Sequence, residues 1–384
     1  MPLTDDDRRT LSYGFEFAYN DVSSNSYGKT LNISNGEING FSNDFKVQSR
    51  YPDGGGEYLS SAFYIDYRQD INPKSTLNSG IRLTNTNLHA TWVDQTFIQL
   101  PETEISSNNS AVTATLGYVY KPARNWQLNS VLSSGFRSPN IDDVGRVREK
   151  SGDVTVPNID VKPEFAYNAE VGIQKYFNNR KFRLGANIFY TLLDNYIIRD
   201  HFTLNGSDQV LFDDEYGNAV ANQNRGNAFI TGYTISYLGK LSNSFNTSGF
   251  ITYTKGRTYD TEEPMSSIPP LFGQFEINYI KDKIEVGAAL RFNSRKDIAD
   301  FNFTEGIDNH DLTPVVDANA TNDKDIYFGT PSWITLGING RYSVTENFSV
   351  QARLDNIFDE HYIEFASGVS SPGRNLSLSF VANF

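Results

Sequence analysis

The sequence LSYGFEFAYN at residues 11–20 alternates large apolar residues with small or polar ones. Its odd positions are Leu11, Tyr13, Phe15, Phe17 and Tyr19. A period of two is typical of a β-strand, because successive side chains of a strand point to opposite faces of the sheet. The stretch therefore predicts a strand whose two faces meet different surroundings, one apolar and one polar.

The same alternation recurs along the whole chain and predicts an all-β, antiparallel fold of about fourteen strands. The strands are expected near residues 10–20, 57–70, 75–93, 108–121, 125–137, 163–177, 180–202, 218–239, 244–260, 268–281, 283–296, 331–343, 347–362 and 374–384.

The connections between these segments alternate strictly between short and long. The short ones are rich in turn-forming residues, as at Asn72-Pro73-Lys74, whereas the long ones span residues 21–56, 94–107, 138–162, 203–217, 261–267, 297–330 and 363–373. Outer-membrane barrels have short periplasmic turns and long extracellular loops. The alternation therefore predicts a transmembrane β-barrel in the bacterial outer membrane, surrounded by lipid, with its C-terminus at the periplasmic side.

Composition supports this class and argues against others. Aromatic residues make up 14% of the 384 residues, and such rings favour strands. The formal net charge of −13 argues against a nucleic-acid partner. The chain contains no cysteine, which excludes disulfides and thiolate metal sites. The four histidines are far apart in sequence and no catalytic motif is present, so we expect neither an enzyme nor a resident metal or cofactor.

Three groups of motif residues resemble the barrel domain of TonB-dependent outer-membrane receptors. The first lies in residues 49–54 and the strand and turn that follow, up to Arg82. The second pairs Phe136-Arg137-Ser138-Pro139 with Pro157-Asn158, and the third is centred on Asn356 and is followed by a last strand ending at Phe384. Together they extend from about residue 49 to residue 384.

The resemblance implies a barrel of about 22 strands whose lumen holds a plug domain. This chain would supply the last fourteen or so strands, with no plug, as a partial barrel over residues 10–384 after an unstructured segment at 1–9. It implies the barrel-assembly machinery as a partner, and the TonB complex as a partner of the complete receptor only. It implies uptake of a small metal chelate, an iron–siderophore ahead of haem or cobalamin.

Residues on the long loops form the pool for ligand contact, because binding residues concentrate on loops held by a rigid scaffold. This pool comprises Tyr51, Arg146, Arg148, Lys150, His201, Arg225 and Tyr327. Haem receptors that resemble this chain commonly carry a histidine near the loop between the two boxes, whereas residues 140–156 contain none. The boxes are therefore interpreted as loop anchors, and arginines on the polar face, such as Arg353, as members of a lumen charge network with partners such as Glu170 and Asp355.

Two other functions fit the strand pattern. A closed barrel of fourteen strands would be a passive pore, and steady ohmic conductance by this chain alone would favour it. A β-sheet surface adhesin would be extracted by carbonate without detergent.

Overall fold

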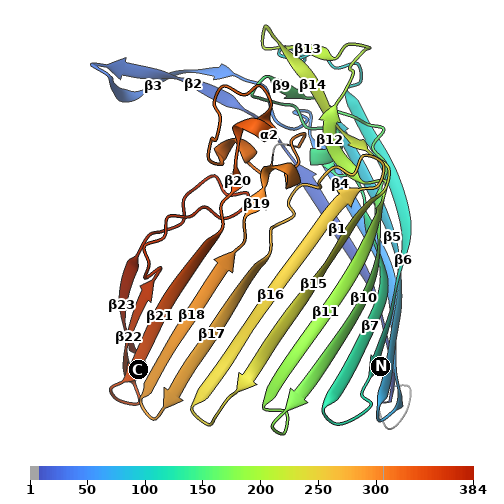
Figure 1. The fold of residues 1–384 in the computed structure, drawn as a ribbon. Helices are drawn as coiled ribbons and strands as arrows, with labels where there is room; N and C mark the ends of the chain where they lie inside the picture. Colours follow the sequence, from blue (N-terminus) through green and yellow to red (C-terminus); the bar gives the residue numbers. More distant parts are fainter. Residues whose placement is uncertain (1–7, 306) are drawn as a thin grey trace.

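The computed structural model describes residues 8–305 and 307–384, and its main feature is one antiparallel sheet of fourteen strands (Figure 1). The predicted all-β, antiparallel class and the number of strands in the sheet are confirmed. In chain order, which is also their order in the sheet, the strands are β1 (Arg9–Val22), β4 (Gly56–Asn72), β5 (Ser75–Thr91), β6 (Glu104–Tyr120), β7 (Trp126–Arg137), β10 (Glu164–Phe177), β11 (Phe182–Asp194), β15 (Ala228–Lys240), β16 (Phe245–Thr258), β17 (Phe272–Lys281), β18 (Ile284–Asn293), β21 (Trp333–Ser343), β22 (Phe348–Asp355) and β23 (Asn375–Ala382).

The register keeps large apolar side chains on one face from strand to strand. Phe15 pairs with Phe63, Phe63 with Leu83, and Leu83 with Val112. These four side chains are 42–66% exposed, although they are apolar. An apolar face this exposed matches the lipid-facing side of a barrel, whose strands alternate apolar and polar residues.

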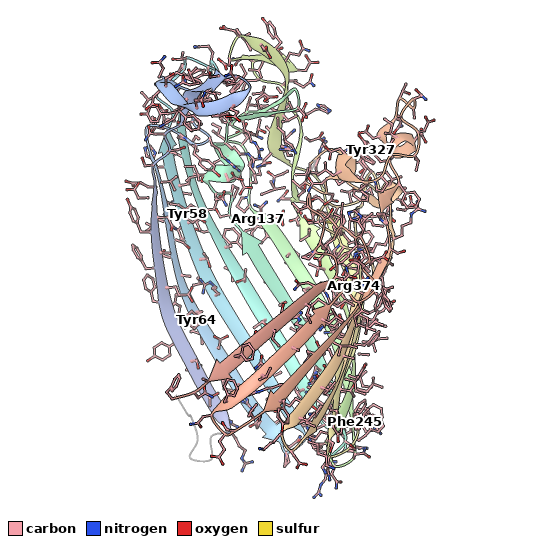
Figure 2. The ribbon with its side chains drawn as sticks, turned by 90° about the vertical axis from the view of Figure 1, so that its left-hand side faces the viewer. Tyr58, Tyr64, Arg137, Phe245, Tyr327 and Arg374 are labelled. Atoms are coloured by element: carbon pink, nitrogen blue, oxygen red, sulfur yellow. The ribbon has the colours of Figure 1, made fainter. Side chains whose placement is uncertain are left out.

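The sheet curves around a hollow and has two open edges (Figure 2). In the part of the chain that the structure describes, no strand pairs with the outer edge of β1 or of β23. The start of β1 and the end of β23 lie at the end of the sheet that carries the short turns (Figure 1). The long connections lie at the opposite end, which we call the rim, as their alternation predicted.

Two of the predicted strands are wrong in extent. The segment expected at 180–202 breaks after β11, where Asn195 has a φ of 55°, and resumes as β12 (Ile197–His201). The segment expected at 218–239 is likewise divided into β14 (Glu215–Asn224) and β15. Both predictions merged a barrel strand with a strand of a different sheet.

That second sheet, the rim sheet, has the order β12-β14-β9-β8, with β13 (Gln209–Phe212) also paired to β14. It includes β8 (Arg148–Lys150) and β9 (Asp153–Thr155), and β9 runs parallel to β14. A parallel pair cannot arise from a simple hairpin. The rim sheet therefore ties the connection after β7 to the connection after β11.

The connection expected at 21–56 contains a hairpin of β2 (Tyr27–Ser34) and β3 (Glu37–Lys46), which projects from the rim (Figure 1). Its tip is Asn35-Gly36, both with positive φ, a sequence preferred in two-residue hairpin turns. The other short elements are α1 (Ile141–Val144), β19 (Lys296–Asp297), η1 (Ile298–Asp300), η2 (His310–Leu312), α2 (Asp323–Ile326) and β20 (Gly329–Thr330). Among the described residues, no helix is long and apolar enough to cross a membrane.

Residues 1–7 of the segment expected to be unstructured lie outside the described residues. The prediction is wrong at Arg9, which is already the first residue of β1 and pairs with Gln69. Strand β22 is also shorter than expected and ends at Asp355, because Asn356 adopts a φ of 47°.

The two faces of the sheet should respond differently to a new charge. Ile235 lies on the apolar face of β15 and is 47% exposed, whereas its neighbour Thr234 lies on the polar face and hydrogen-bonds Thr252. In the protein embedded in lipid, Ile235→Arg should lower the free energy of unfolding by about 2–4 kcal/mol, and Thr234→Arg by much less. Urea titration in lipid vesicles measures both, and equal effects would contradict a lipid-facing Ile235.

Candidate ligand-binding site at the rim

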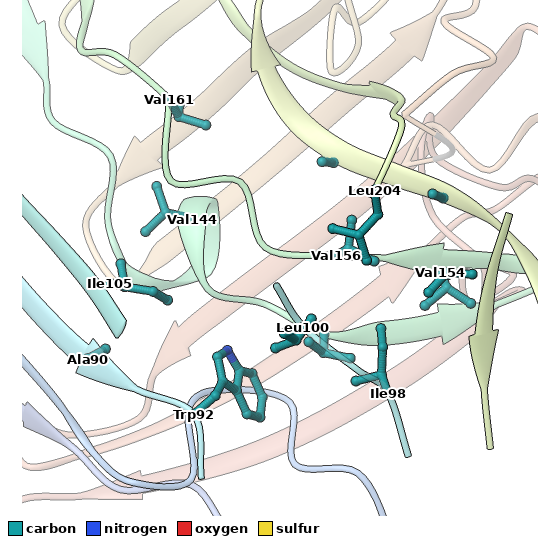
Figure 3. Close-up of a cluster of buried hydrophobic side chains, with 14 of the residues drawn as sticks. Ala90, Trp92, Ile98, Leu100, Ile105, Val144, Val154, Val156, Val161 and Leu204 are labelled. Carbon is teal, nitrogen blue, oxygen red and sulfur yellow. The ribbon is translucent and has the colours of Figure 1, made fainter. Parts of the chain in front are cut away.

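Three long connections share one apolar core above the sheet (Figure 3). Trp92, Ile98 and Leu100 follow β5, Val144, Val154 and Val156 follow β7, and Leu204 follows β11. All are at most 8% exposed. Loops with a core of their own hold their side chains in fixed positions, which a binding site requires.

Asp142, in the first turn of α1, contacts three side chains. The Tyr51 hydroxyl donates to Asp142 Oδ1 at 2.7 Å, and Arg146 Nη1 donates to Oδ2 at 3.0 Å. Arg50 Nη2 lies 3.4 Å from the same carboxylate. Burial, and secondarily the bond to Asp142, raises the pKa of Tyr51, so the hydroxyl stays a hydrogen-bond donor at neutral pH.

Arg199 of β12 joins this group. Its guanidinium donates to the backbone carbonyl of Glu305. Burial lowers the pKa of Arg199, and the positive charges of Arg146 and Arg148 lower it further. Arg148 and Arg199 both belong to the rim sheet, and Arg146 lies two residues before β8. We call these three residues the arginine cluster, whose positive charges attract anions.

Tyr51, Arg146 and Arg148 belong to the pool of ligand-contact residues predicted from the sequence, whereas Arg199 does not. Residue 199 lay inside a segment predicted as a continuous barrel strand, so it was not placed on a loop. The signal that could have found it is Asp194-Asn195 within that segment, since Asn tolerates positive φ and commonly marks a break.

Glu305, in the connection between β18 and β21, hydrogen-bonds residues of two other rim connections. It accepts hydrogen bonds from the hydroxyls of Ser266 and Tyr196, the latter at 3.3 Å. Below it, the ammonium of Lys296 lies 3.8 Å from Asp308 Oδ2 and over the ring of Phe365. Lys296 and Asp308 are 5% and 1% exposed. This rim cluster fixes the long connection between β18 and β21.

Three of the remaining residues of the predicted pool, Lys150, His201 and Arg225, lie on or beside the strands of the rim sheet, whereas Tyr327 does not. Lys150 ends β8 opposite Asp153, and His201 is exposed at the end of β12. Arg225 forms an ion pair with Asp200. Tyr327 contacts His310, with ring centroids 5.7 Å apart, and lies on a different part of the rim from Arg137 (Figure 2).

The paired boxes make the contacts of loop anchors. Phe136 packs against Phe165 with ring centroids 5.4 Å apart, and Pro139 is fully buried. Arg137 Nη1 donates to both oxygens of Asp143 at 3.0 and 2.9 Å. Pro157 precedes Asn158, whose amide donates to the Asn222 carbonyl at 2.7 Å.

Asn356 plays a similar part after β22. Its side-chain amide donates to the carbonyls of Glu360 and Pro372, and its oxygen accepts from the Glu360 amide at 3.0 Å. Phe384 lies beyond the end of β23 and is fully exposed.

The polar face of the sheet carries ion pairs. Only some of them are among those predicted from the sequence. Arg353 pairs with Asp355 at 2.7 Å, as predicted. Arg82 instead pairs with Glu16, and the expected partner Glu170 accepts a hydrogen bond from Asn187. Arg82 and Glu16 belong to β5 and β1, so their ion pair crosses the intervening strand β4, whereas Arg353 and Asp355 lie two residues apart on β22.

Comparison with known proteins identifies the family of this chain. The family model described as "TonB dependent receptor-like, beta-barrel" matches residues 3–357. The chain is 25% identical over 276 residues to the Hemoglobin and hemoglobin-haptoglobin-binding protein A of Haemophilus influenzae, a match that covers 68% of this chain and 24% of the relative. The Hemoglobin-binding protein A of the same organism is 26% identical over 263 residues.

Solved structures share the fold at low identity. The Copper transporter OprC superposes with a TM-score of 0.73 and 16% identity, covering 98% of this chain and 54% of OprC. The ferripyoverdine receptor of the Pseudomonas aeruginosa outer membrane gives 0.70 and 17%, covering 98% and 46%. The chain thus spans about a quarter of its curated relatives and about half of these receptors.

The buried acids of the rim cluster predict a pH dependence. Burial raises the pKa of Glu305 and of Asp308 above their ordinary values. A carboxyl group whose pKa is raised in the folded state stabilises the fold at pH values below its pKa in the unfolded chain. This stabilisation is lost as the pH rises through its pKa in the folded state. Lys296, whose pKa burial lowers to about 8, remains protonated in both states below neutral pH and does not oppose this trend there.

Limited proteolysis of residues 297–330 should therefore be several-fold slower at pH 5 than at pH 7.5, because cleavage follows the population of the open loop. Glu305→Gln should reduce this ratio, whereas Glu346→Gln, at an exposed position in a short turn, should not. An unchanged ratio in Glu305→Gln would refute the role of this carboxyl.

Proposed function

Because this chain belongs to the TonB-dependent receptor-like β-barrel family, we propose that it is the C-terminal barrel portion of an outer-membrane receptor that imports an iron–siderophore-like chelate. In this proposal the rim faces the outside of the cell. The chelate is captured there, and its passage follows movement of a plug that is driven by the TonB complex of the inner membrane.

The arginine cluster is the observation that carries the ligand assignment. Arg146 shares Asp142 with the Tyr51 hydroxyl, and Arg148 and Arg199 belong to the rim sheet, on connections held by a buried core. Many ferric chelates are anionic, and guanidinium groups bind carboxylate and catecholate oxygens through charge-assisted hydrogen bonds. Chelate binding at this cluster is therefore the function that the geometry supports best.

The open edges support completion of the barrel by strands outside this chain. An unpaired N–H or C=O group in lipid costs several kcal/mol, so the outer edges of β1 and β23 require partners. A barrel of about 22 strands leaves room for a plug in its lumen, whereas a passive pore of fourteen strands would need β1 and β23 to pair with each other. The coverage of about half of the solved receptors agrees with the larger barrel.

Haem is the second candidate, because the curated relatives are named as hemoglobin-binding proteins. A chelate is preferred because residues 140–156 contain no histidine, whereas they carry Arg146 and Arg148. Growth on haem of a strain whose haem uptake depends on the wild-type receptor would distinguish the two: haem as the ligand predicts growth, whereas an anionic chelate as the ligand predicts none.

Binding of a highly anionic ferric tris-catecholate to the complete receptor should weaken roughly tenfold in the Arg148→Ala variant, the size expected for one charge-assisted contact. Lys150→Ala, which lies farther along β8, should have a smaller effect. Quenching of intrinsic fluorescence during titration measures both.

A neutral ferric tris-hydroxamate provides the ligand control and Lys240→Ala, at the short-turn end of β15, the residue control. If Arg148→Ala bound the anionic chelate with unchanged affinity, the arginine cluster would be excluded as the site.

A further inference from the structure

A pocket lined by aromatic rings lies on the polar face of the sheet, just below the rim. Phe250 of β16 pairs with Gln274 of β17, which pairs with Arg291 of β18. Phe250 lies two residues from Thr252, whose hydrogen bond to Thr234 is on the polar face. Side chains two residues apart on a strand, and those paired across strands, share a face, so these side chains point into the hollow of the sheet.

The same face carries a second row of paired residues nearer to the rim. Phe272, Asn293 and Trp333 lie side by side in the register, at the rim ends of β17, β18 and β21. The connection between β22 and β23 contributes Glu364 and Phe365 to the same space, a cleft of about 310 Å³ that we call the aromatic pocket. Its lining includes Phe250, Phe272, Arg291, Trp333, Glu364 and Phe365.

The membrane does not account for these rings. On the other face of the same strands, Phe275 and Phe292 stack with centroids 6.0 Å apart, and these rings meet lipid in the proposed orientation. The rings of the aromatic pocket instead face the hollow, where polar side chains are the rule. An apolar surface on the polar side of a barrel indicates a site for an apolar group.

Packing between separate elements holds the rings in place. Phe250 meets Phe272 edge to face, with ring centroids 6.0 Å apart. Trp333 packs on Tyr362 of the connection after β22, with ring centroids 4.3 Å apart. Because offset and edge-to-face arrangements are the stable ones for aromatic rings, the pocket is formed before a ligand enters it.

The polar groups of the aromatic pocket carry no net charge. Arg291 Nη2 lies 2.9 Å from Glu364 Oε1, and the guanidinium lies over the Trp333 ring, 5.6 Å from its centroid. This ion pair cancels the charge that would attract an anion, in contrast to the arginine cluster. The buried indole Nε1–H of Trp333 has no hydrogen-bond partner among the residues that the structure describes. A buried donor without a partner is unfavourable, and an oxygen atom that reaches it removes this penalty.

We propose that the aromatic pocket binds an aryl ring of the imported chelate, such as a catechol or phenol group. The ring packs among Phe250, Phe272 and Trp333, and its oxygen substituents face the donors of Arg291 and Trp333. Ligand pockets commonly measure about 300–1,000 Å³, so a cleft of about 310 Å³ takes one part of a chelate rather than the whole. This inference rests on the proposed uptake and narrows its substrate to chelates that carry aromatic groups.

The test uses the complete receptor and two anionic ferric complexes, a tris-catecholate, which has rings, and a citrate complex, which has none. Phe250→Leu should weaken binding of the tris-catecholate roughly three- to tenfold, the size of one aromatic contact, and should leave citrate binding unchanged. Phe250→Tyr, which keeps the ring, should retain most of the affinity. Phe275→Leu makes the same change on the opposite face of the sheet and is the matched control, expected to bind both complexes as wild type does. Isothermal titration calorimetry measures the dissociation constants.

Any of three results would overturn the proposal: wild-type affinity of Phe250→Leu for the tris-catecholate, an equal loss for citrate, or an equal loss in Phe275→Leu. Arg148→Ala tests the proposed uptake separately, because it should weaken both complexes through their charge. A loss confined to Arg148→Ala would leave the proposed uptake standing and exclude the aromatic pocket. A loss confined to Phe250→Leu would keep the aromatic pocket and exclude the arginine cluster.

Discussion

The pairing of backbone N–H and C=O groups is the constraint on which this structure depends. Fourteen strands satisfy one another in simple chain order, and each leaves its apolar residues on one side. Because the sheet satisfies the backbone groups, the side chains on its two faces can differ in polarity. The ladder thus permits an exposed apolar exterior and a polar interior in the same strands.

The rim follows a different rule, because its connections leave the sheet and need a core of their own. Residues from three connections supply that core, and a parallel pairing of β9 with β14 ties two of them together. The arginine cluster is carried by this assembly rather than by single loops. Its guanidinium groups are consequently held near each other despite their repulsion, with Asp142 and Glu305 as counter-groups.

Much of the fold could be predicted from the sequence. Alternation such as that of Tyr13, Phe15 and Phe17 is a local property, so the strands and their order were predictable. The rim was not. Nothing local distinguishes Ile197–His201 from the barrel strand before it, since the difference lies in which distant strand it pairs with. Arg199 was missed for this reason, whereas Arg146 and Arg148 were found because they lie in an obvious loop. Pairing across long sequence distances, as between Glu305 and Tyr196, has no short-range signal.

The hairpin of β2 and β3 has a consequence for engineering. Its base is fastened by the 2.7 Å ion pair between Lys46 and Asp94, whereas a Cβ atom built at Gly36 or Gly40 would meet no described atom within 4 Å. Projecting tips that nothing packs against tolerate inserted sequence. In the proposed orientation, a foreign peptide spliced at Asn35-Gly36 would be displayed at the tip of the projecting hairpin (Figure 1), which makes this turn a natural graft point for an epitope or a fluorescent label.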